Sequence, residues 1–280
     1  MMIDSEDIEK ANQLIVESDA ILIGAGAGLS IAAGIAYSGT RFTNNFADYI
    51  ERYKLTDMYS ASFYPFHTLE EKWGYFSRHI KFNRFDAKIG KVYTDILNLV
   101  KDKNYFVITT NVDSQFFRAG FHSQRVFATQ GDYGKFQCKI ACHDELYDNE
   151  DVITQMVEKQ ADCHIPSSLV PYCPVCGGNM VSHLRIDANF IENADWKKTR
   201  ERYVNFIQQS LGKQFVLLEL GVGFNTPGII RWPMEQIAMN YEKSALIRVN
   251  KEHVQPTYDI QDKSLLIEND ITEFIEKLTH

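Results

Sequence analysis

The chain has 280 residues, of which 45% are hydrophobic and 24% are charged. A chain of this size buries a substantial core, and its 16 glycines and 7 prolines are too few for a collagen-like or low-complexity protein. The formal net charge of −8 argues against nucleic acid or an anionic membrane as a partner, because both are bound largely through cations. We therefore expect a small molecule or another protein as the partner.

The amino-terminal residues predict neither export nor membrane insertion. Residues 1–20 carry acidic side chains where a secretory signal has a basic start, so we expect a cytoplasmic protein. The longest apolar run, residues 20–36, contains four glycines and lacks basic flanks. At about 1.5 Å per helical residue this run spans about 26 Å of a roughly 30 Å hydrocarbon layer, which is too short.

Hydrophobic periodicity predicts helices that alternate with buried strands. We expect helices over residues 4–18, 87–100 and 271–278, a short helical segment after the glycines at 24–28, and strands over residues 20–23, 104–109, 125–128, 214–220 and 244–249. Residues 42–84 are rich in aromatic side chains without strand alternation and predict a mostly helical insertion. This order of elements is typical of an α/β protein with a doubly wound, parallel, Rossmann-like sheet.

Composition divides the chain into a large domain and two insertions. The Rossmann-like domain is expected over residues 1–41, 85–135 and 214–280, with residues 42–84 as the helical insertion. Residues 136–213 contain cysteines, prolines and paired glycines, and we expect them to form a small zinc-ribbon-like module.

Glycine, amide and carboxylate residues follow each predicted strand. In open α/β sheets, ligands bind at the carboxyl edge of the strands, so these residues predict one shared site. They are the glycines at 24–28, Asn111 and Asp113, Gln130, the loop at 221–225, and the loop at 250–252. The alternative is that these are ordinary polar loops, which follow strands in every α/β protein.

The glycine loop between the first strand and the next helix suits a phosphate group. Glycines there let the backbone approach a pyrophosphate. However, the spacing of Gly24, Gly26 and Gly28 fails the GxGxxG fingerprint, and no second strand ends in an acidic residue about 20 positions later. The loop therefore predicts nucleotide binding but not a hydride-transfer dehydrogenase.

Six motifs in this order resemble those of the sirtuin family, across nearly the whole chain. Residues 26–35 (GAGLSIAAGI) resemble the sirtuin NAD loop, and residues 110–113 (TNVD) resemble the T-Q-N-I-D signature. Gln130 precedes Gly131 where sirtuins carry His-Gly, and residues 173–178 (CPVCGG) resemble half of their zinc ribbon. Residues 221–223 resemble the G-T-S turn, and residues 249–252 (VNKE) resemble the I-N-x-E adenosine loop.

The resemblance implies that NAD is the co-substrate of the large domain. It implies NAD contacts from Gly26, Ala27, Gly28, Ser30, Gly34, Arg41, Phe42, Thr110, Gly221, Gly223, Asn225, Asn250, Lys251, Glu252 and Asp270. Sirtuins continue their first loop into P-D-F-R, whereas this chain has AYSG at 36–39. Arg41 and Phe42 follow two places later, and the sequence leaves open whether they replace the family's Phe and Arg. For Asp270, a helix cap is an equally good explanation.

Gln130 separates this chain from the deacylating sirtuins. The matching histidine is the general base of sirtuin deacylation, and a glutamine side chain does not titrate near neutral pH. Loss of nicotinamide needs no such base, because a carboxylate such as Asp113 can stabilise the ribosyl cation while Asn111 orients the ribose or a water. We therefore expect Asn111, Asp113 and Gln130 to be the catalytic residues of an ADP-ribosyltransferase.

Within the family, the chain resembles the macrodomain-linked bacterial sirtuins. That resemblance implies mono-ADP-ribosylation of a lipoylated carrier protein similar to glycine-cleavage H protein, and a partner macrodomain that removes the modification. Two alternatives stay open, namely an NAD-dependent lysine deacylase and a non-catalytic NAD or ADP-ribose sensor.

Four cysteines in two pairs predict a structural zinc site. Cys138 and Cys142, together with Cys173 and Cys176, supply the four thiolates that suit tetrahedral zinc. Four protein ligands leave no open position, so zinc would brace the module. Free buried thiols are the alternative, and Cys163 or His164 could replace one ligand.

The aromatic insertion allows two interpretations. It could form an apolar channel for an acyl or lipoyl arm over the NAD site, or it could be ordinary helix packing.

Overall fold

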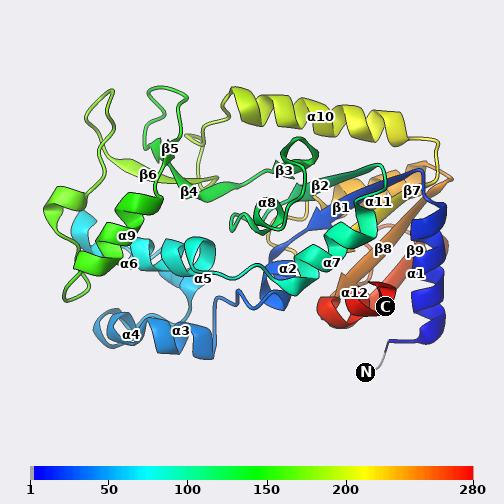
Figure 1. Ribbon diagram of the computed structural model, residues 1–280, viewed down its shortest axis with the longest axis horizontal. Helices are drawn as coiled ribbons and strands as arrows, with labels where there is room; N and C mark the ends of the chain where they lie inside the picture. Colours follow the sequence, from blue (N-terminus) through cyan, green and yellow to red (C-terminus); the bar gives the residue numbers. More distant parts are fainter. Residues whose placement is uncertain (1–2, 280) are drawn as a thin grey trace.

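A six-stranded parallel sheet forms the centre of the computed structural model, which describes residues 3–279 (Figure 1). The spatial order is β3-β2-β1-β7-β8-β9, and every neighbouring pair is parallel. The strands are β1 (Ala20–Ala25), β2 (Tyr105–Thr109), β3 (Val126–Ala128), β7 (Phe215–Leu220), β8 (Ser244–Asn250) and β9 (Ser264–Glu268). The predicted Rossmann-like sheet is confirmed. Its order reverses at β1, which places a ligand crevice at the carboxyl ends of β1, β2 and β7.

Helices cover both faces of this sheet. One face packs against α1 (Ser5–Glu17), α2 (Ala27–Ala32), α7 (Lys91–Val100), α8 (Gln115–Arg118) and α12 (Ile271–Thr279). The other face packs against α10 (Ala194–Ser210) and α11 (Arg231–Asn240). Alternate residues of β1 serve the two cores, with Ile21 and Ile23 on the first and Leu22 on the second. Because both faces are buried, the strands are apolar runs without alternation.

Several elements of the large domain were not predicted from the sequence, namely strand β9 and helices α8, α10 and α11. The strand β9 is short and lies between polar residues, which hides its apolar pattern. Helix α10 lies within residues 136–213, which we assigned to the small module. Its side chains Trp196, Tyr203 and Phe206 pack instead on the large sheet, against strands β2 and β3 (Figure 1).

The helical insertion and the cysteine-containing segment pack together as one smaller body, on the left in Figure 1. The insertion contains α3 (Thr40–Asn45), α4 (Ala47–Tyr53), α5 (Met58–Ala61), α6 (Leu69–Ile80) and a π-helical turn, Lys81–Phe85. The cysteine segment contributes α9 (Glu150–Lys159) and an antiparallel sheet of β4 (Gly131–Cys138), β5 (Tyr147–Asp148) and β6 (Met180–Leu184). The rings of Trp73 and Phe136 join the two segments with centroids 5.0 Å apart.

Short 3-10 turns complete the connections, at Ser123–Arg125, Ser167–Leu169 and Gln261–Lys263. Across residues 3–279, none of the helices is long and apolar enough to cross a membrane. The apolar run that begins at residue 20 folds into β1 and α2. The cytoplasmic location stays a prediction, and residues 1, 2 and 280 of the predicted large domain lie outside the described residues.

Candidate active site

A cavity of about 570 Å³ lies between the carboxyl edge of the large sheet and the smaller body. Much of its lining comes from the loops that the sequence singled out. The predicted site residues on its wall are Gly26, Ala27, Ser30, Thr110, Asn111, Asp113, Gln130, Gly223 and Asn225. They come from loops after β1, β2, β3 and β7, so four of the five predicted loops meet at one site.

The glycines of the first loop are required by a close approach of two backbones. The N–H of Gly28 donates to the carbonyl of Gly221 over 2.9 Å, and a Cβ at Gly28 would lie 2.6 Å from the Cα of Gly221. Gly221 itself has φ +62°, in the left-handed region that favours glycine. Neither residue lines the cavity. Their part is to hold the loops after β1 and β7 side by side, which positions Gly26 and Gly223 on the cavity wall.

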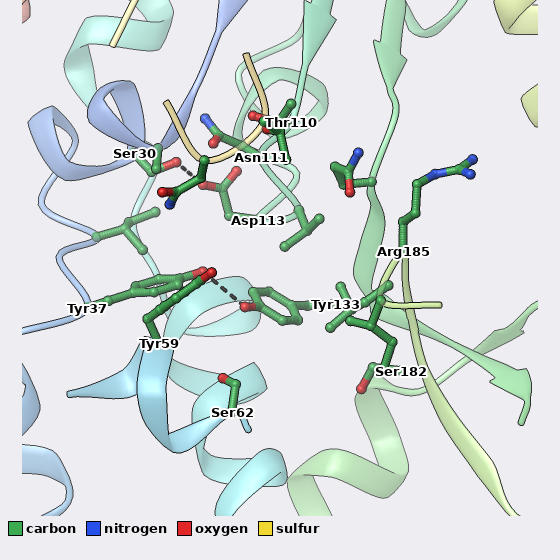
Figure 2. Close-up of a pocket in the computed structure, with 18 of the residues that line it drawn as sticks. Ser30, Tyr37, Tyr59, Ser62, Thr110, Asn111, Asp113, Tyr133, Ser182 and Arg185 are labelled. Atoms are coloured by element: carbon green, nitrogen blue, oxygen red, sulfur yellow. Dashed lines mark hydrogen bonds between the residues drawn. The ribbon is translucent and has the colours of Figure 1, made fainter. Parts of the chain in front are cut away.

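Asp113 is the buried acid of the site, with 4% of its surface exposed. The hydroxyl of Ser30 donates to one carboxylate oxygen over 2.5 Å, and the N–H of Gln115 donates to the other over 3.0 Å. Burial raises the pKa of Asp113, although these two hydrogen bonds oppose the shift. Figure 2 shows Ser30 and Asp113 joined at one end of the cavity, beside Asn111.

Asn111 is held beside this acid by its own hydrogen bonds. Its side-chain amide donates to the carbonyl of Gly26 over 2.8 Å, and its backbone N–H donates to the hydroxyl of Thr109 over 3.0 Å. Thr109 in turn donates to the carbonyl of Ala25. These bonds tie the loop after β2 to the loop after β1, so the amide has a fixed position next to Asp113.

Gln130 lies in the turn after the short strand β3 and is half-buried on the cavity wall. Its carbonyl accepts the N–H of Arg185 over 3.0 Å. Arg185 also lines the cavity, and its guanidinium donates to Glu192 over 2.7 Å. Figure 2 shows Arg185 across the cavity from Asp113. Sequence reasoning missed Arg185, because it follows a strand of the small sheet and no motif marks it.

Other predicted NAD residues lie away from the cavity wall. Arg41 donates to the side chain of Asn83 over 2.6 Å and to the carbonyl of Phe82 over 2.8 Å, within the helical insertion. Phe42 is 1% exposed and stacks on Phe46. Both side chains are therefore committed to the insertion. Gly34, at φ +85°, serves the turn that follows α2 and does not line the cavity.

The loop after β8 also lies outside the cavity wall. Lys251 pairs with Asp270 over 3.0 Å, and Asp270 accepts the N–H of Thr272 over 2.8 Å as a cap of α12. Asn250 donates to the carbonyl of Val222 over 3.3 Å, which links this loop to the one after β7. Glu252 is exposed. The geometry thus supports the helix-cap interpretation of Asp270, and the NAD contacts of these residues stay predictions.

A buried ion cluster formed by side chains of β7, β8 and α11 holds the loop after β8 in place. Arg248 donates to Glu219 over 2.7 Å and to Glu235 over 2.7 Å. Arg231 donates to the carbonyls of His253 and Gln255. All four charged side chains are at most 1% exposed. Because each charge has a partner, the cluster holds the loop without leaving a buried charge unpaired.

The aromatic side chains of the insertion lie in two places. Tyr59, Phe63, Trp73 and Phe76 line the cavity together with Tyr37, and the channel for an acyl or lipoyl arm stays a prediction. The others pack among themselves in a buried cluster that includes Phe42, Phe46, Tyr49 and Tyr75.

The four predicted cysteines come together and fit a zinc ion. The sulfurs of Cys138, Cys142, Cys173 and Cys176 all lie within 4.8 Å of one another. The pairs Cys138–Cys176 and Cys142–Cys173 are each 3.7 Å apart. Four sulfurs at about 2.3 Å from a tetrahedral zinc lie about 3.8 Å apart, so the spacing matches. Within residues 3–279, Cys163 and His164 do not join this group, and His164 instead faces Glu71.

Comparison with known proteins finds close relatives of this chain. It is 35% identical over 272 residues to a protein ADP-ribosyltransferase of Staphylococcus aureus (strain Mu50 / ATCC 700699). The matched region covers 97% of this chain and 86% of the relative. It is 32% identical over 255 residues to a probable bifunctional ADP-ribose hydrolase/ADP-ribosyltransferase of Fusarium oxysporum f. sp. cubense. That match covers 85% of this chain and 41% of the relative. No protein-family model matches the chain.

Solved sirtuins share the fold. The structure of Sir2Tm bound to a propionylated peptide superposes with a TM-score of 0.62 at 19% identity, covering 97% of this chain and 96% of that one. A Sir2 homologue in complex with ADP-ribose superposes with a TM-score of 0.63 at 16% identity, covering 99% and 95% of the two chains. The chain therefore belongs to the sirtuin family of NAD-dependent enzymes, in the group of sirtuin-type protein ADP-ribosyltransferases.

Proposed function

We propose that this protein transfers one ADP-ribose from NAD to a lipoylated carrier protein similar to glycine-cleavage H protein. The observation that carries the proposal is that the cavity is lined by both Asp113 and Gln130. The site has a buried acid to assist nicotinamide loss, whereas glutamine stands where a deacylase needs a base. The name of the Staphylococcus relative supports the transfer reaction.

The proposed chemistry uses the side chains of Asp113 and Asn111, which hydrogen bonds hold in place, together with Gln130. The ionised carboxylate of Asp113 stabilises the positive charge that develops on the ribose as the bond between its anomeric carbon and the nicotinamide nitrogen breaks. The electron pair of that bond leaves with nicotinamide, and a pair from the acceptor forms the new bond to the same carbon. Asn111 orients the ribose, and Gln130 contributes hydrogen bonds but takes no proton. Burial raises the pKa of Asp113. As the pH is lowered, we therefore expect activity to begin to fall at a higher pH than it would with an exposed aspartate.

The apolar end of the cavity supports a long acyl or lipoyl arm as the group that enters it. Tyr59 and Phe63 stand at the mouth with 56% and 65% of their surfaces exposed, and Trp73 and Phe76 lie on the same cavity wall. Lys72 and Arg185 add two cations to the lining. An aliphatic arm tipped by a polar group suits this arrangement.

A macrodomain hydrolase is the functional partner in this proposal. The Fusarium relative supports it, because its name joins an ADP-ribose hydrolase to an ADP-ribosyltransferase in one protein. An enzyme that removes ADP-ribose next to one that adds it makes the modification reversible.

Lysine deacylation is the second candidate. The fold shared with a sirtuin that binds a propionylated peptide favours it, as does the apolar cavity. Gln130 disfavours it, because loss of a positioned general base typically costs about two to four orders of magnitude in rate.

The test follows nicotinamide release and the intact mass of two substrates, a lipoylated carrier protein and an acetylated peptide, each incubated with NAD. We expect a carrier heavier by one ADP-ribose and an unchanged peptide. Asp113→Asn should lower nicotinamide release by about 100-fold or more. Asp151→Asn, on the exposed face of α9, is the matched control and should leave it unchanged.

Three other outcomes would each replace the proposal. Loss of the acetyl group would establish the deacylase. Absence of nicotinamide release with both substrates would indicate an NAD or ADP-ribose sensor. If Gln130→His raised deacylation strongly while the carrier stayed unmodified, the deacylase would again be favoured.

A further inference from the structure

The half-buried Tyr37 and three buried side chains form a hydrogen-bonded relay from the cavity into the helical insertion. The hydroxyls of Tyr37 and Tyr133 lie 3.0 Å apart, and the Tyr133 hydroxyl lies 2.9 Å from Nε2 of His79. Nδ1 of His79 lies 3.2 Å from the hydroxyl of Tyr75, which donates to the carbonyl of Met58 over 3.1 Å. Tyr37 and Tyr133 line the cavity, and Figure 2 shows their hydroxyls joined across it. The proposed transfer uses none of these side chains.

The far end of the relay favours one direction for its bonds. A carbonyl only accepts, so Tyr75 is the donor in its bond to Met58, whose carbonyl also accepts the hydroxyl of Ser62 over 2.8 Å. Tyr75 must then accept from Nδ1 of His79. A neutral histidine carries one N–H, so Nε2 accepts from the hydroxyl of Tyr133. The Tyr133 oxygen in turn accepts from Tyr37.

The relay keeps this direction because its members do not change charge near neutral pH. His79 is fully buried, and burial lowers its pKa to about 3, with a smaller effect from the charge of Arg41. Burial likewise raises the pKa of Tyr37 to about 12. Tyr37 therefore keeps its one proton, and that proton is committed to Tyr133.

We propose that Tyr37 presents only a hydrogen-bond acceptor to the cavity and binds an N–H or O–H group of NAD there. The direction that begins at Tyr75 and runs through His79 and Tyr133 turns the Tyr37 proton away from the cavity. The inference rests on NAD occupying the cavity, and it does not depend on which acceptor protein is modified.

The position of Tyr37 indicates which half of NAD it meets. Tyr37 and Asp113 line the same cavity, and the charge of Asp113 is among the influences that raise the pKa of Tyr37. Asp113 is the acid that we place beside the reacting ribose. The donor is thus the carboxamide N–H of the nicotinamide or a hydroxyl of its ribose.

Binding measurements on Tyr37→Phe test this assignment without needing any transfer reaction. Titration calorimetry should show NAD bound about 3- to 10-fold more weakly, the loss expected for one neutral hydrogen bond. If ADP-ribose weakens equally, the donor is the ribose hydroxyl. If only NAD weakens, and its advantage over nicotinic acid adenine dinucleotide shrinks, the donor is the carboxamide. Tyr49→Phe is the matched control, because its buried hydroxyl bonds to the carbonyl of Cys163 away from the cavity.

A double-variant cycle tests the relay itself. Tyr133→Phe removes the acceptor that holds the Tyr37 proton, so NAD affinity should fall although Tyr37 is unchanged. In the Tyr37→Phe background the same substitution should have no further effect on affinity. Thermal unfolding is followed in parallel, so that each titration is made well below the midpoint of the variant.

Two results would overturn the inference. The first is a Tyr37→Phe protein that binds both NAD and ADP-ribose as tightly as the parent. The second is a double variant in which the two losses multiply, since Tyr133 would then act independently of Tyr37. If the binding pattern holds but no carrier protein is modified, only the proposed function fails.

Discussion

The large sheet and the smaller body are held together by different kinds of interaction. The cores on both faces of the sheet are built from aliphatic and aromatic side chains on neighbouring parallel strands, such as Leu22, Val107 and Leu218. The smaller body also has two apolar clusters, and to these it adds four clustered thiols and the hydrogen bonds of His79. The comparison teaches that the sheet combines apolar burial with one buried ion cluster, whereas the smaller body combines apolar burial with a thiol cluster that fits zinc and with buried hydrogen bonds.

Breaking the thiol cluster should have the largest effect and should separate the two regions. We expect Cys173→Ser to lose bound zinc, because the free energy of structural zinc binding is folding free energy, about 10 kcal/mol or more in small zinc-binding peptides. Hydrogen exchange should show β4 and β6 opening while β1 and β7 stay protected. Metal content by mass spectrometry gives the second readout.

The control for this experiment is Cys163→Ser, since Cys163 is buried but lies outside the cluster. It should retain one zinc and normal protection. Equal protection of β4 in both variants would show that the smaller body does not depend on the metal.

A cavity in the large sheet should destabilise the other region, namely the sheet, and leave the thiol cluster intact. Leu22 is fully buried in β1, so Leu22→Ala should lower the free energy of unfolding by about 2–5 kcal/mol. The loss should appear across the parallel sheet in hydrogen exchange, with zinc still bound. Val16→Ala, on the exposed side of α1, should change stability by about 0.5 kcal/mol or less.

The loops after β1 and β7 lie against each other, so a methyl group should be tolerated at Gly223 but not at Gly28. Gly28→Ala places a Cβ against the backbone of Gly221 and should cost about 1–3 kcal/mol. Gly223→Ala meets open space and should leave the unfolding midpoint nearly unchanged. Equal losses in urea titrations would contradict the close approach of the two loops.

Acid should lower the stability of the smaller body before that of the large sheet. We expect this to be the smallest of the effects for each unit of pH. The pKa of His79 is about 3 when folded and about 6.5 when unfolded, so the unfolded chain binds the proton more tightly below pH 6.5. This contribution to stability is complete above pH 6.5 and declines by up to about 1.4 kcal/mol per pH unit as the pH falls toward 3. Urea titrations from pH 7.5 to 5 should show a shallower decline for His79→Gln. An identical slope would mean that His79 is already charged.

The sequence predicted the large sheet well because its strands carry their burial in their own residues. The runs around Ile21, Val107, Leu217 and Ile247 are apolar on both faces, and each became a strand. Strand β9 escaped prediction because its alternating burial resembles a half-exposed segment. Helix α10 escaped because it has a weak apolar stripe and lies within a range dominated by the cysteines.

The site was predictable to the extent that it is built from loops after strands. Asn111, Asp113 and Gln130 all line the same cavity, and their catalytic roles stay predictions. The antiparallel sheet was not predicted, since its strands pair across distant segments and β4 contains an irregularity between Asp132 and Phe136. For the same reason Arg185 had no signal in the sequence.

The sequence by itself determined the family, the parallel sheet and the four thiols, because these depend on residue types at fixed spacings. Only the tertiary structure decided that Arg41 and Phe42 turn into the helical insertion and that Tyr37 faces the cavity. It also brought Tyr37 into hydrogen-bond reach of Tyr133, which in turn contacts His79 and Tyr75 on α6, all of them far from Tyr37 in the chain. The physical reason is that spacing fixes local geometry, whereas burial and hydrogen-bond direction depend on neighbours that only folding supplies.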